Sequence, residues 1–230
     1  MASDSGVDDW QAAAETFGRR FVVVEQAFEA AGRRFELLKP RSPDELISEE
    51  DFNRDERLPY WADVWPSALC LAERIAQLPP GGRLLELGCG VGFVCAVAAA
   101  CGFEVTATDY YAEALEFTQV NLAKNGLPRA ATRLVDWRRF PDDLGQFDWV
   151  VAADVLYEKD YPALVAAAID RGLKPNGCAL VADPGRRHAM PFERECRDRR
   201  LSLRRIQQSP YHNGAERHMV DLYEIRRGGC

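Results

Sequence analysis

The feature that most constrains the fold of this chain is the alternation, from residue 83 onward, of short apolar runs with longer segments of helical periodicity. The apolar runs span residues 83–87, 104–108, 132–135, 147–153 and 178–182. The helical segments between them span roughly residues 91–101, 112–125 and 161–171. Continuous apolar strands that alternate with helices predict a parallel sheet with helices on both faces, and hence an α/β fold.

The C-terminal part of the chain departs from this alternation. Residues 201–207 and 219–225 are two strand candidates with no clear helix between them. Partial alternation of apolar and polar residues in the second segment is typical of a half-buried strand. We therefore expect a late hairpin that adds an antiparallel strand to the sheet.

The N-terminal part carries a different pattern. Apolar residues recur at helical spacing from residue 8 to residue 31, which predicts one amphipathic helix. A short strand is expected at residues 33–38, followed by a short helix that a capping box opens at Ser42. We expect residues 1–57 to form a helical and short-strand appendage, and residues 58–230 to form one domain.

The composition excludes several classes of protein. Apolar residues make up 47% of the chain and charged residues 28%, which is ordinary for a globular protein. No apolar run approaches the ~20 residues of a membrane span, and the acidic N-terminus lacks a secretion signal, so we expect no membrane partner. The seven cysteines lack CxxC spacing, which favours reduced thiols in a cytoplasmic protein without a metal site.

The net charge of −7 is distributed unevenly. Residues 1–65 hold 15 acidic and 8 basic side chains, whereas the rest of the chain holds 21 of each. An acidic protein lacks the basic footprint of a nucleic-acid binder, so no nucleic-acid partner is expected. The acidic excess either forms a solvated face or attracts a cationic substrate. The acidic side chains nearest to the start of the domain are Glu49, Glu50, Asp51, Asp55 and Glu56.

An acidic, glycine-rich stretch directly follows the first apolar run. Its sequence is Glu86-Leu87-Gly88-Cys89-Gly90-Val91-Gly92. In open α/β sheets, ligands bind beyond the C-terminal ends of the strands, where glycines allow the backbone to approach them closely. Phe93 stands where a dinucleotide fingerprint has Gly or Ala, so that type of site is not indicated. The stretch predicts a cofactor-binding turn, with a tight strand-to-helix turn as the alternative.

A second acidic residue closes the next apolar run. Asp109 is followed by Tyr110, and the expected helix begins near Ala112. An acid at the tip of the adjacent strand can accept two hydrogen bonds from a ribose diol. The alternative is that Asp109 caps the following helix. Together with the glycine-rich stretch, Asp109 makes the chain resemble the class I, seven-β-strand S-adenosylmethionine-dependent methyltransferases, over about residues 83–225.

Further motifs narrow this resemblance. Asp136-Trp137 follows the third run, where an indole can lie on an adenine face and the carboxylate can accept from its amine. The fourth run closes with Asp154-x-x-Tyr157, and a Pro-Tyr-Trp-Ala…Trp-Pro stretch at residues 59–66 leads into the domain. These motifs resemble the family 16 protein lysine methyltransferases. An Asp-Pro-Gly-Arg stretch after the fifth run resembles the electron-transfer flavoprotein β-subunit lysine methyltransferase group within that family.

The resemblance implies a Rossmann-like fold of seven strands, mostly parallel with an antiparallel final strand, and the cofactor S-adenosyl-L-methionine. The cofactor-binding residues that it implies are Trp65, Glu86, Gly88, Cys89, Gly90, Gly92, Asp109, Tyr110, Asp136, Trp137 and Ala153. The implied catalytic residues, facing the acceptor, are Asp154 and Tyr157. From the residues alone, the two tryptophans also fit core aromatics, Asp154 a helix cap and Tyr157 a buried ring.

The predicted function is N-methylation of a lysine side chain in a protein substrate. One alternative is a small-molecule N- or O-methyltransferase, because the fold alone does not set the acceptor. Another is a cofactor-binding partner protein without transferase activity. The chain lacks the Asn-Pro-Pro-Tyr stretch that enzymes methylating nucleic-acid amines usually have at the end of strand four, which also disfavours a nucleic-acid acceptor. The sequence predicts neither the identity of the acceptor nor the oligomeric state.

Overall fold

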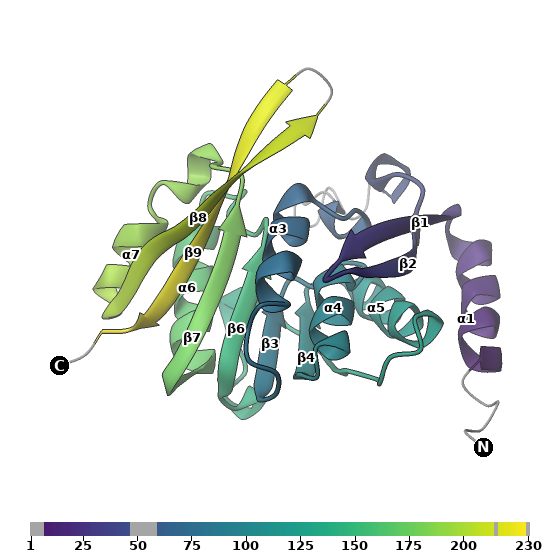
Figure 1. Cartoon of the computed structure of the whole chain (residues 1–230), viewed down its shortest axis with the longest axis horizontal. Coiled ribbons are helices and arrows are strands. Elements are labelled where there is room, and N and C mark those ends of the chain that lie inside the picture. The colour runs from purple at the N-terminus through teal and green to yellow at the C-terminus, as the bar shows by residue number, and fades with distance from the viewer. Residues whose placement is uncertain (1–6, 47–58, 214–215, 229–230) are drawn as a thin grey trace.

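The computed structural model describes residues 7–46, 59–213 and 216–228, and a seven-stranded sheet forms its centre (Figure 1). The strands are β3 (Arg83–Leu87), β4 (Glu104–Asp109), β5 (Ala131–Leu134), β6 (Phe147–Ala153), β7 (Leu173–Asp183), β8 (Leu201–Asn213) and β9 (Glu216–Arg227). Their order in the sheet is β5-β4-β3-β6-β7-β9-β8. The strands from β5 to β7 are parallel, and β9 is antiparallel to both β7 and β8. The predicted Rossmann-like sheet and its late hairpin are confirmed.

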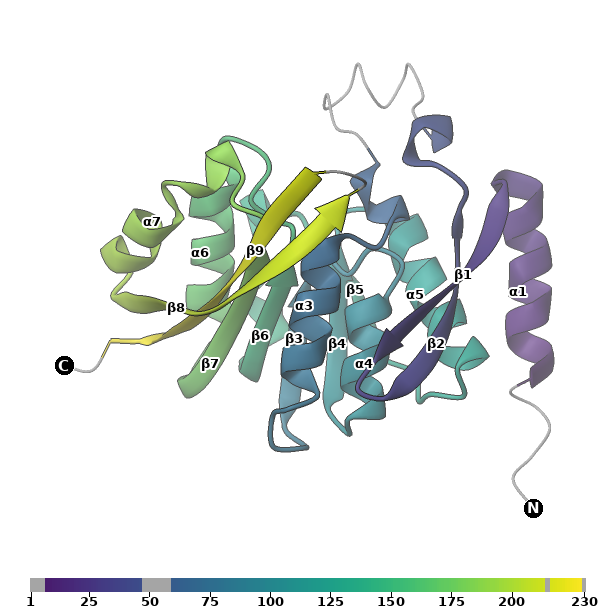
Figure 2. The ribbon, with the colours of Figure 1, turned by 45° about the horizontal axis from the view of Figure 1, so that its top comes forward.

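Helices cover both faces of this sheet (Figure 2). They are α3 (Pro66–Ile75), α4 (Phe93–Ala100) and α5 (Ala112–Lys124) on one face, and α6 (Tyr161–Gly172) and α7 (Phe192–Asp198) on the other. Within β3 the side chains alternate between two hydrophobic clusters, since Leu84 packs toward the first face while Leu85 and Leu87 pack toward the second. Each fully buried leucine stabilises the fold by roughly 1.5–3 kcal/mol. No helix within the described ranges is long and apolar enough to cross a bilayer.

The N-terminal segment corrects one prediction. Its elements are α1 (Val7–Arg20), β1 (Val23–Ala30), β2 (Arg33–Pro40) and a 3₁₀ turn (Pro43–Leu46). The expected single helix over residues 8–31 is wrong beyond Arg20, because its second half is the first strand of a hairpin. Ala31 and Gly32 both have positive φ, 56° and 67°, as the favoured two-residue hairpin turn requires. The short strand expected at residues 33–38 is confirmed as β2.

Two asparagines, Asn121 in α5 and Asn125 at the C-cap of that helix, bind this hairpin to the helical layer. The Asn121 amide accepts a hydrogen bond from the Leu38 nitrogen at 2.7 Å and donates to the Leu38 oxygen at 2.9 Å. It also donates to the Val91 oxygen, in the glycine-rich stretch, at 2.8 Å. Asn125 makes the same two-way contact with Glu36, at 3.0 and 2.9 Å. The two side chains therefore satisfy backbone groups of β2 that an adjacent strand would otherwise satisfy.

Aromatic packing joins α1 to the same hydrophobic cluster. Phe17 stacks on Phe117 of α5, with ring centroids 4.3 Å apart, and Phe21 meets the ring of Trp61 edge-on at 6.4 Å. The predicted boundary between appendage and domain, at residues 57 and 58, lies outside the described residues. The five acidic side chains between residues 49 and 56 lie outside them as well.

Candidate active site

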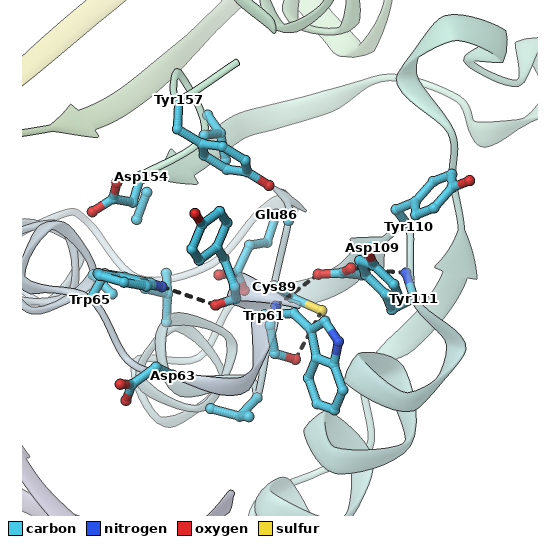
Figure 3. Close-up of a pocket in the computed structure, with 18 of the residues that line it drawn as sticks. Trp61, Asp63, Trp65, Glu86, Cys89, Asp109, Tyr110, Tyr111, Asp154 and Tyr157 are labelled. Carbon is cyan, nitrogen blue, oxygen red and sulfur yellow. Dashed lines mark hydrogen bonds between the residues drawn. The ribbon is translucent and has the colours of Figure 1, made fainter. Parts of the chain in front are cut away.

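A cavity opens at the C-terminal ends of β3, β4 and β6, where the glycine-rich stretch and the two acidic strand ends meet (Figure 3). Of the thirteen residues that the sequence assigned to cofactor or acceptor, all except Gly92 line it. In Figure 3, Asp154 and Trp65 lie on one side of the cavity, and Asp109 lies opposite them with Tyr110 and Tyr111. One cavity thus brings the separate sequence motifs together.

The glycine-rich stretch gives the cavity its floor. Gly88 has a φ of 73°, and a Cβ there would lie 3.3 Å from the Val155 side chain and 3.6 Å from the Trp137 ring. Gly90 has a φ of 54°, and a Cβ there would lie 2.9 Å from the Trp61 carbonyl oxygen. Both positions therefore require glycine, because of the backbone conformation and because a side chain would not fit.

Gly92 serves packing rather than the cavity. Its φ is 86°, and a Cβ would lie 2.7 Å from Oγ1 and 2.8 Å from Cα of Thr118 in α5. The glycine allows α4, which begins at Phe93, to pack closely against α5. Sequence spacing did not separate this role from ligand contact, because both require glycine.

Asp109 is held in place by backbone donors. One carboxylate oxygen accepts from the Gly90 nitrogen at 2.9 Å, and the other accepts from the Tyr111 nitrogen at 3.0 Å. The residue is only 6% exposed. Burial raises the pKa of this carboxyl to about 6, although the backbone hydrogen bonds oppose that shift. The carboxylate therefore joins the glycine turn to the start of α5 and still faces the cavity.

Glu86 carries a buried carboxylate oxygen that is unsatisfied. The residue is 2% exposed, and its Oε2 has no hydrogen-bond partner among the described residues. Burial, reinforced by the nearby charge of Asp109, raises the pKa of Glu86 well above its usual value. Because an orphaned polar atom in a cavity wall is costly, the site suits a ligand that brings a donor or a cation to Glu86.

Aromatic rings form an arc around the cavity. Their spatial order around the arc is Trp65, Tyr60, Tyr157, Tyr161 and Trp137. Neighbouring rings meet edge-to-face, with centroids 5.9, 5.3, 5.0 and 5.3 Å apart. The Trp65 indole also donates to the Tyr60 carbonyl oxygen at 2.9 Å. The sequence motifs did not identify Tyr60 and Tyr161 as site residues. Tyr161 is the first residue of α6, whereas Tyr157 lies in the loop before that helix, so no helical spacing indicated that their rings would meet.

Trp61, which like Tyr60 comes from the entrance stretch, belongs to the hydrophobic core and also lines the cavity. It is 9% exposed and lines the cavity while its ring meets Phe117 and Tyr111, with centroids 5.7 and 6.2 Å apart. The entrance stretch therefore connects the cavity directly to the packing of the N-terminal helix.

Asp136 and Tyr110 lie at the rim near Arg138. The Asp136 carboxylate accepts from the backbone nitrogen of Arg138 at 3.0 Å and from its guanidinium Nε at 2.9 Å. The same guanidinium lies 5.7 Å from the centre of the Tyr110 ring. A ligand amine would therefore share the Asp136 carboxylate with Arg138, a competition that the sequence pattern did not reveal.

Asp154 holds a strained position at the end of β6. Its φ is +58°, a left-handed conformation that costs a non-glycine residue of order 1–3 kcal/mol. One carboxylate oxygen accepts from the Arg186 guanidinium at 2.7 and 2.6 Å, and the other accepts from the Ser67 hydroxyl at 3.3 Å. Burial raises the pKa of Asp154, and Arg186 opposes that rise. Asp154, which the sequence places at the acceptor, therefore has a charged partner, Arg186, that the sequence motifs did not assign.

The lining of the cavity is strongly acidic. It includes five carboxyl side chains, and among the described lining residues none is Lys, Arg or His. The carboxyls belong to Asp63, Glu86, Asp109, Asp136 and Asp154. A cavity with acidic and aromatic walls favours a ligand that carries positive charge.

Comparison with known proteins assigns this chain to a family. Residues 60–226 match a family described as a methyltransferase domain. The protein N-lysine methyltransferase METTL21A of Xenopus tropicalis is 32% identical over 112 residues, which are 45% of this chain and 52% of that protein. The electron transfer flavoprotein beta subunit lysine methyltransferase of Xenopus laevis is 31% identical over 137 residues, 56% of this chain and 53% of that protein.

The chain therefore spans about half the length of these curated relatives. Among solved structures, the Thermus thermophilus 16S rRNA N2 methyltransferase RsmC, in complex with AdoMet and guanosine, superposes with a TM-score of 0.62 at 19% identity. That match covers 90% of this chain and 51% of the other. At such identity the likeness establishes a shared fold.

Proposed function

The chain belongs to the methyltransferase-domain family, and from that premise we propose that it is an S-adenosyl-L-methionine-dependent N-methyltransferase whose acceptor is a lysine side chain of a protein. The observation that carries the proposal is the acidic and aromatic lining of the cavity, which suits both a cationic cofactor and a cationic acceptor. The names of the two curated relatives support a protein lysine as acceptor. The five lining carboxylates also disfavour the phosphates of a nucleic acid.

The residues present fit the cofactor. Asp109 would accept from the ribose diol, while the orphaned Oε2 of Glu86 would receive the cationic amino group. Gly88 leaves room beside Trp137, whose ring would lie against the adenine. When bound, the cofactor supplies a methyl group on a sulfonium, which an in-line nucleophile displaces with a neutral leaving group.

The other residues of the cavity would bind the acceptor amine, favour its deprotonation and orient it. A lysine amine, with a pKa of ~10.4 in water, must lose its proton before its lone pair can attack. A site walled by Tyr60, Tyr157 and Tyr161 is partly desolvated, which lowers the pKa of an entering ammonium. Asp154 would orient the amine at near-attack distance, the condition that matters most for a displacement of this kind.

The test is to incubate a proteome extract with the protein and a cofactor labelled on its methyl group. A labelled protein, with trimethyl-, dimethyl- or monomethyl-lysine found by mass spectrometry, is the expected result. Label only in the small-molecule fraction would replace the lysine acceptor by a metabolite. Absence of any transfer, with cofactor binding intact, would leave a binding protein without transferase activity. For the source of the extract we infer a cytoplasmic location, in keeping with the free cysteines of the described chain.

A further inference from the structure

A cation lies behind the acceptor end of the cavity, bound to one of its lining carboxylates although not itself a lining residue. The Arg186 guanidinium binds the Asp154 carboxylate at 2.6 and 2.7 Å and lies 5.6 Å from the centre of the Trp65 ring. The Asp154 side chain is 5% exposed, whereas that of Arg186 is 37% exposed, so a half-exposed guanidinium binds a buried carboxylate. A buried carboxylate beside an aromatic face is also the environment that would bind an alkylammonium ion.

A second buried carboxylate lies at the base of Arg186. Asp183 ends β7, beside the end of β6, and is 1% exposed. Its Oδ1 accepts from the backbone nitrogens of Gly185 and Arg186, at 2.8 and 3.0 Å. Its Oδ2 has no hydrogen-bond partner among the described residues. Two buried carboxyls therefore lie close to Arg186, of which only Asp154 binds the guanidinium, and one oxygen atom of Asp183 stays unsatisfied.

This arrangement provides a second position for the same side chain. The Arg186 backbone is fixed by Asp183, so its side chain can change direction without a shift of the main chain. Gly185 before it has a φ of 77° and open space around its Cβ position, so nothing there crowds the turn. A guanidinium that leaves Asp154 would find an unpaired carboxylate oxygen on the residue that already anchors its backbone.

We propose that Arg186 is an exchangeable internal cation: its guanidinium occupies the acceptor's cation site between Asp154 and Trp65, and moves to Asp183 when a cationic acceptor enters. The proposal rests on the proposed function only in taking this end of the cavity as the acceptor end. An entering ammonium restores a charged partner to Asp154. A neutral acceptor of the same shape offers Asp154 no charged partner, so it does not displace the guanidinium, and the exchange is reserved for cationic acceptors.

The test uses n-butylammonium as a lysine side-chain mimic and 1-butanol as its neutral counterpart. Binding is followed by two NMR signals, the indole N–H of Trp65 and the Nε–H of Arg186, in the chain of 230 residues. Arg186→Ala should tighten n-butylammonium binding about tenfold, because the internal competitor is removed. The affinity for 1-butanol should not change. Arg187→Ala, the adjacent exposed arginine, is the matched control and should behave as the unsubstituted protein.

Asp183→Asn tests the second position. With Arg186 present, it should weaken n-butylammonium binding severalfold, because the displaced guanidinium loses its charged partner. In the Arg186→Ala background the same substitution should have no effect. Equal effects of Asp183→Asn in both backgrounds would overturn the exchange. So would an unchanged affinity for n-butylammonium in Arg186→Ala, which tests the proposal even if the Asp183 variant does not fold.

These measurements need no methyl transfer. Cation exchange without any labelled protein in the extract experiment would refute the proposed function and leave the exchange standing. A labelled protein, together with an unchanged affinity of the Arg186→Ala variant for n-butylammonium, would refute the exchange and leave the proposed function standing. The two failures are therefore distinguishable.

Discussion

The two ends of the cavity, which we propose for the cofactor and for the acceptor, are held in place by different kinds of contact. At the cofactor end, backbone groups position the site, since Asp109 is fixed by the nitrogens of Gly90 and Tyr111. At the acceptor end, side chains position one another, since Asp154 is fixed by the guanidinium of Arg186 and the hydroxyl of Ser67. Backbone contacts are set once the strands and turns form, whereas side-chain contacts can be exchanged. The difference predicts a rigid cofactor end and an adjustable acceptor end.

The largest expected effect is at the rigid end. Asp109→Ala should reduce the affinity for S-adenosylhomocysteine by ~100-fold or more, because it removes the proposed ribose acceptor and releases two backbone donors. Isothermal titration calorimetry measures this. Asp143→Ala, which removes a carboxylate whose side chain is 71% exposed, is the control and should bind normally. Undiminished affinity in the Asp109 variant would remove that residue from the site.

The next effect separates the two ends. Asp154→Ala should lower the rate of methyl transfer by ~100-fold, since the acceptor is no longer oriented, while the affinity for S-adenosylhomocysteine stays within about twofold. Transfer of labelled methyl and calorimetry on the same preparation report the two quantities. Asp160→Ala, at an exposed position before α6, should alter neither. If both quantities fell together in Asp154→Ala, the ends would not be independent.

A stability measurement sharpens the description of the rigid end. Gly92→Ala should lower the free energy of unfolding by ~2–3 kcal/mol, because the new Cβ meets Thr118 and φ is 86°. Gly126→Ala shares the positive φ, 65°, but has nothing within 4 Å, so ~1 kcal/mol is expected there. Urea denaturation compares the pair. Equal losses would mean that strain in φ, and not packing of α4 on α5, requires glycine at position 92.

The smallest effect is a pH dependence of cofactor binding. The pKa of Asp109 in the free protein is raised to about 6, and its ionised form is the one proposed to accept from the ribose. Binding therefore lowers this pKa, and affinity should fall as pH drops through 6, approaching tenfold per unit below it. Glu86→Gln is the suitable background, because the neighbouring carboxyl also titrates at a raised pKa. In Asp109→Asn the dependence should vanish, and its persistence there would assign it to another group.

The parts that sequence predicted well are those that backbone rules determine. The apolar runs became the parallel strands, and glycines at strand ends marked the cavity, because each pattern follows from burial or from φ. The parts it missed depend on tertiary contacts between distant segments. Arg186 follows β7 while Asp154 follows β6, and only the sheet order makes them neighbours. The rings of Tyr60 and Tyr157 likewise meet only after folding.

The incorrect helix at the N-terminus has a similar origin. Phe17, Phe21, Val24 and Phe28 fit one helical stripe, yet the last two lie in a strand. Phe28 packs against Phe93 with ring centroids 5.2 Å apart, so tertiary packing of the hairpin overrides the local period. The turn at Ala31 and Gly32 was the sequence signal for the hairpin, although only Gly32 is a residue that commonly adopts positive φ.

The Asn121 amide has a consequence for anyone who shortens this chain. It bonds at once to Leu38 of the N-terminal hairpin and to Val91 of the glycine-rich stretch. A fragment trimmed to begin at the entrance stretch would remove two of the three hydrogen bonds of that buried amide, beside the glycine-rich stretch. Any shortened form of this chain, or a fusion at this end, should therefore keep residues 33–40 with the methyltransferase domain.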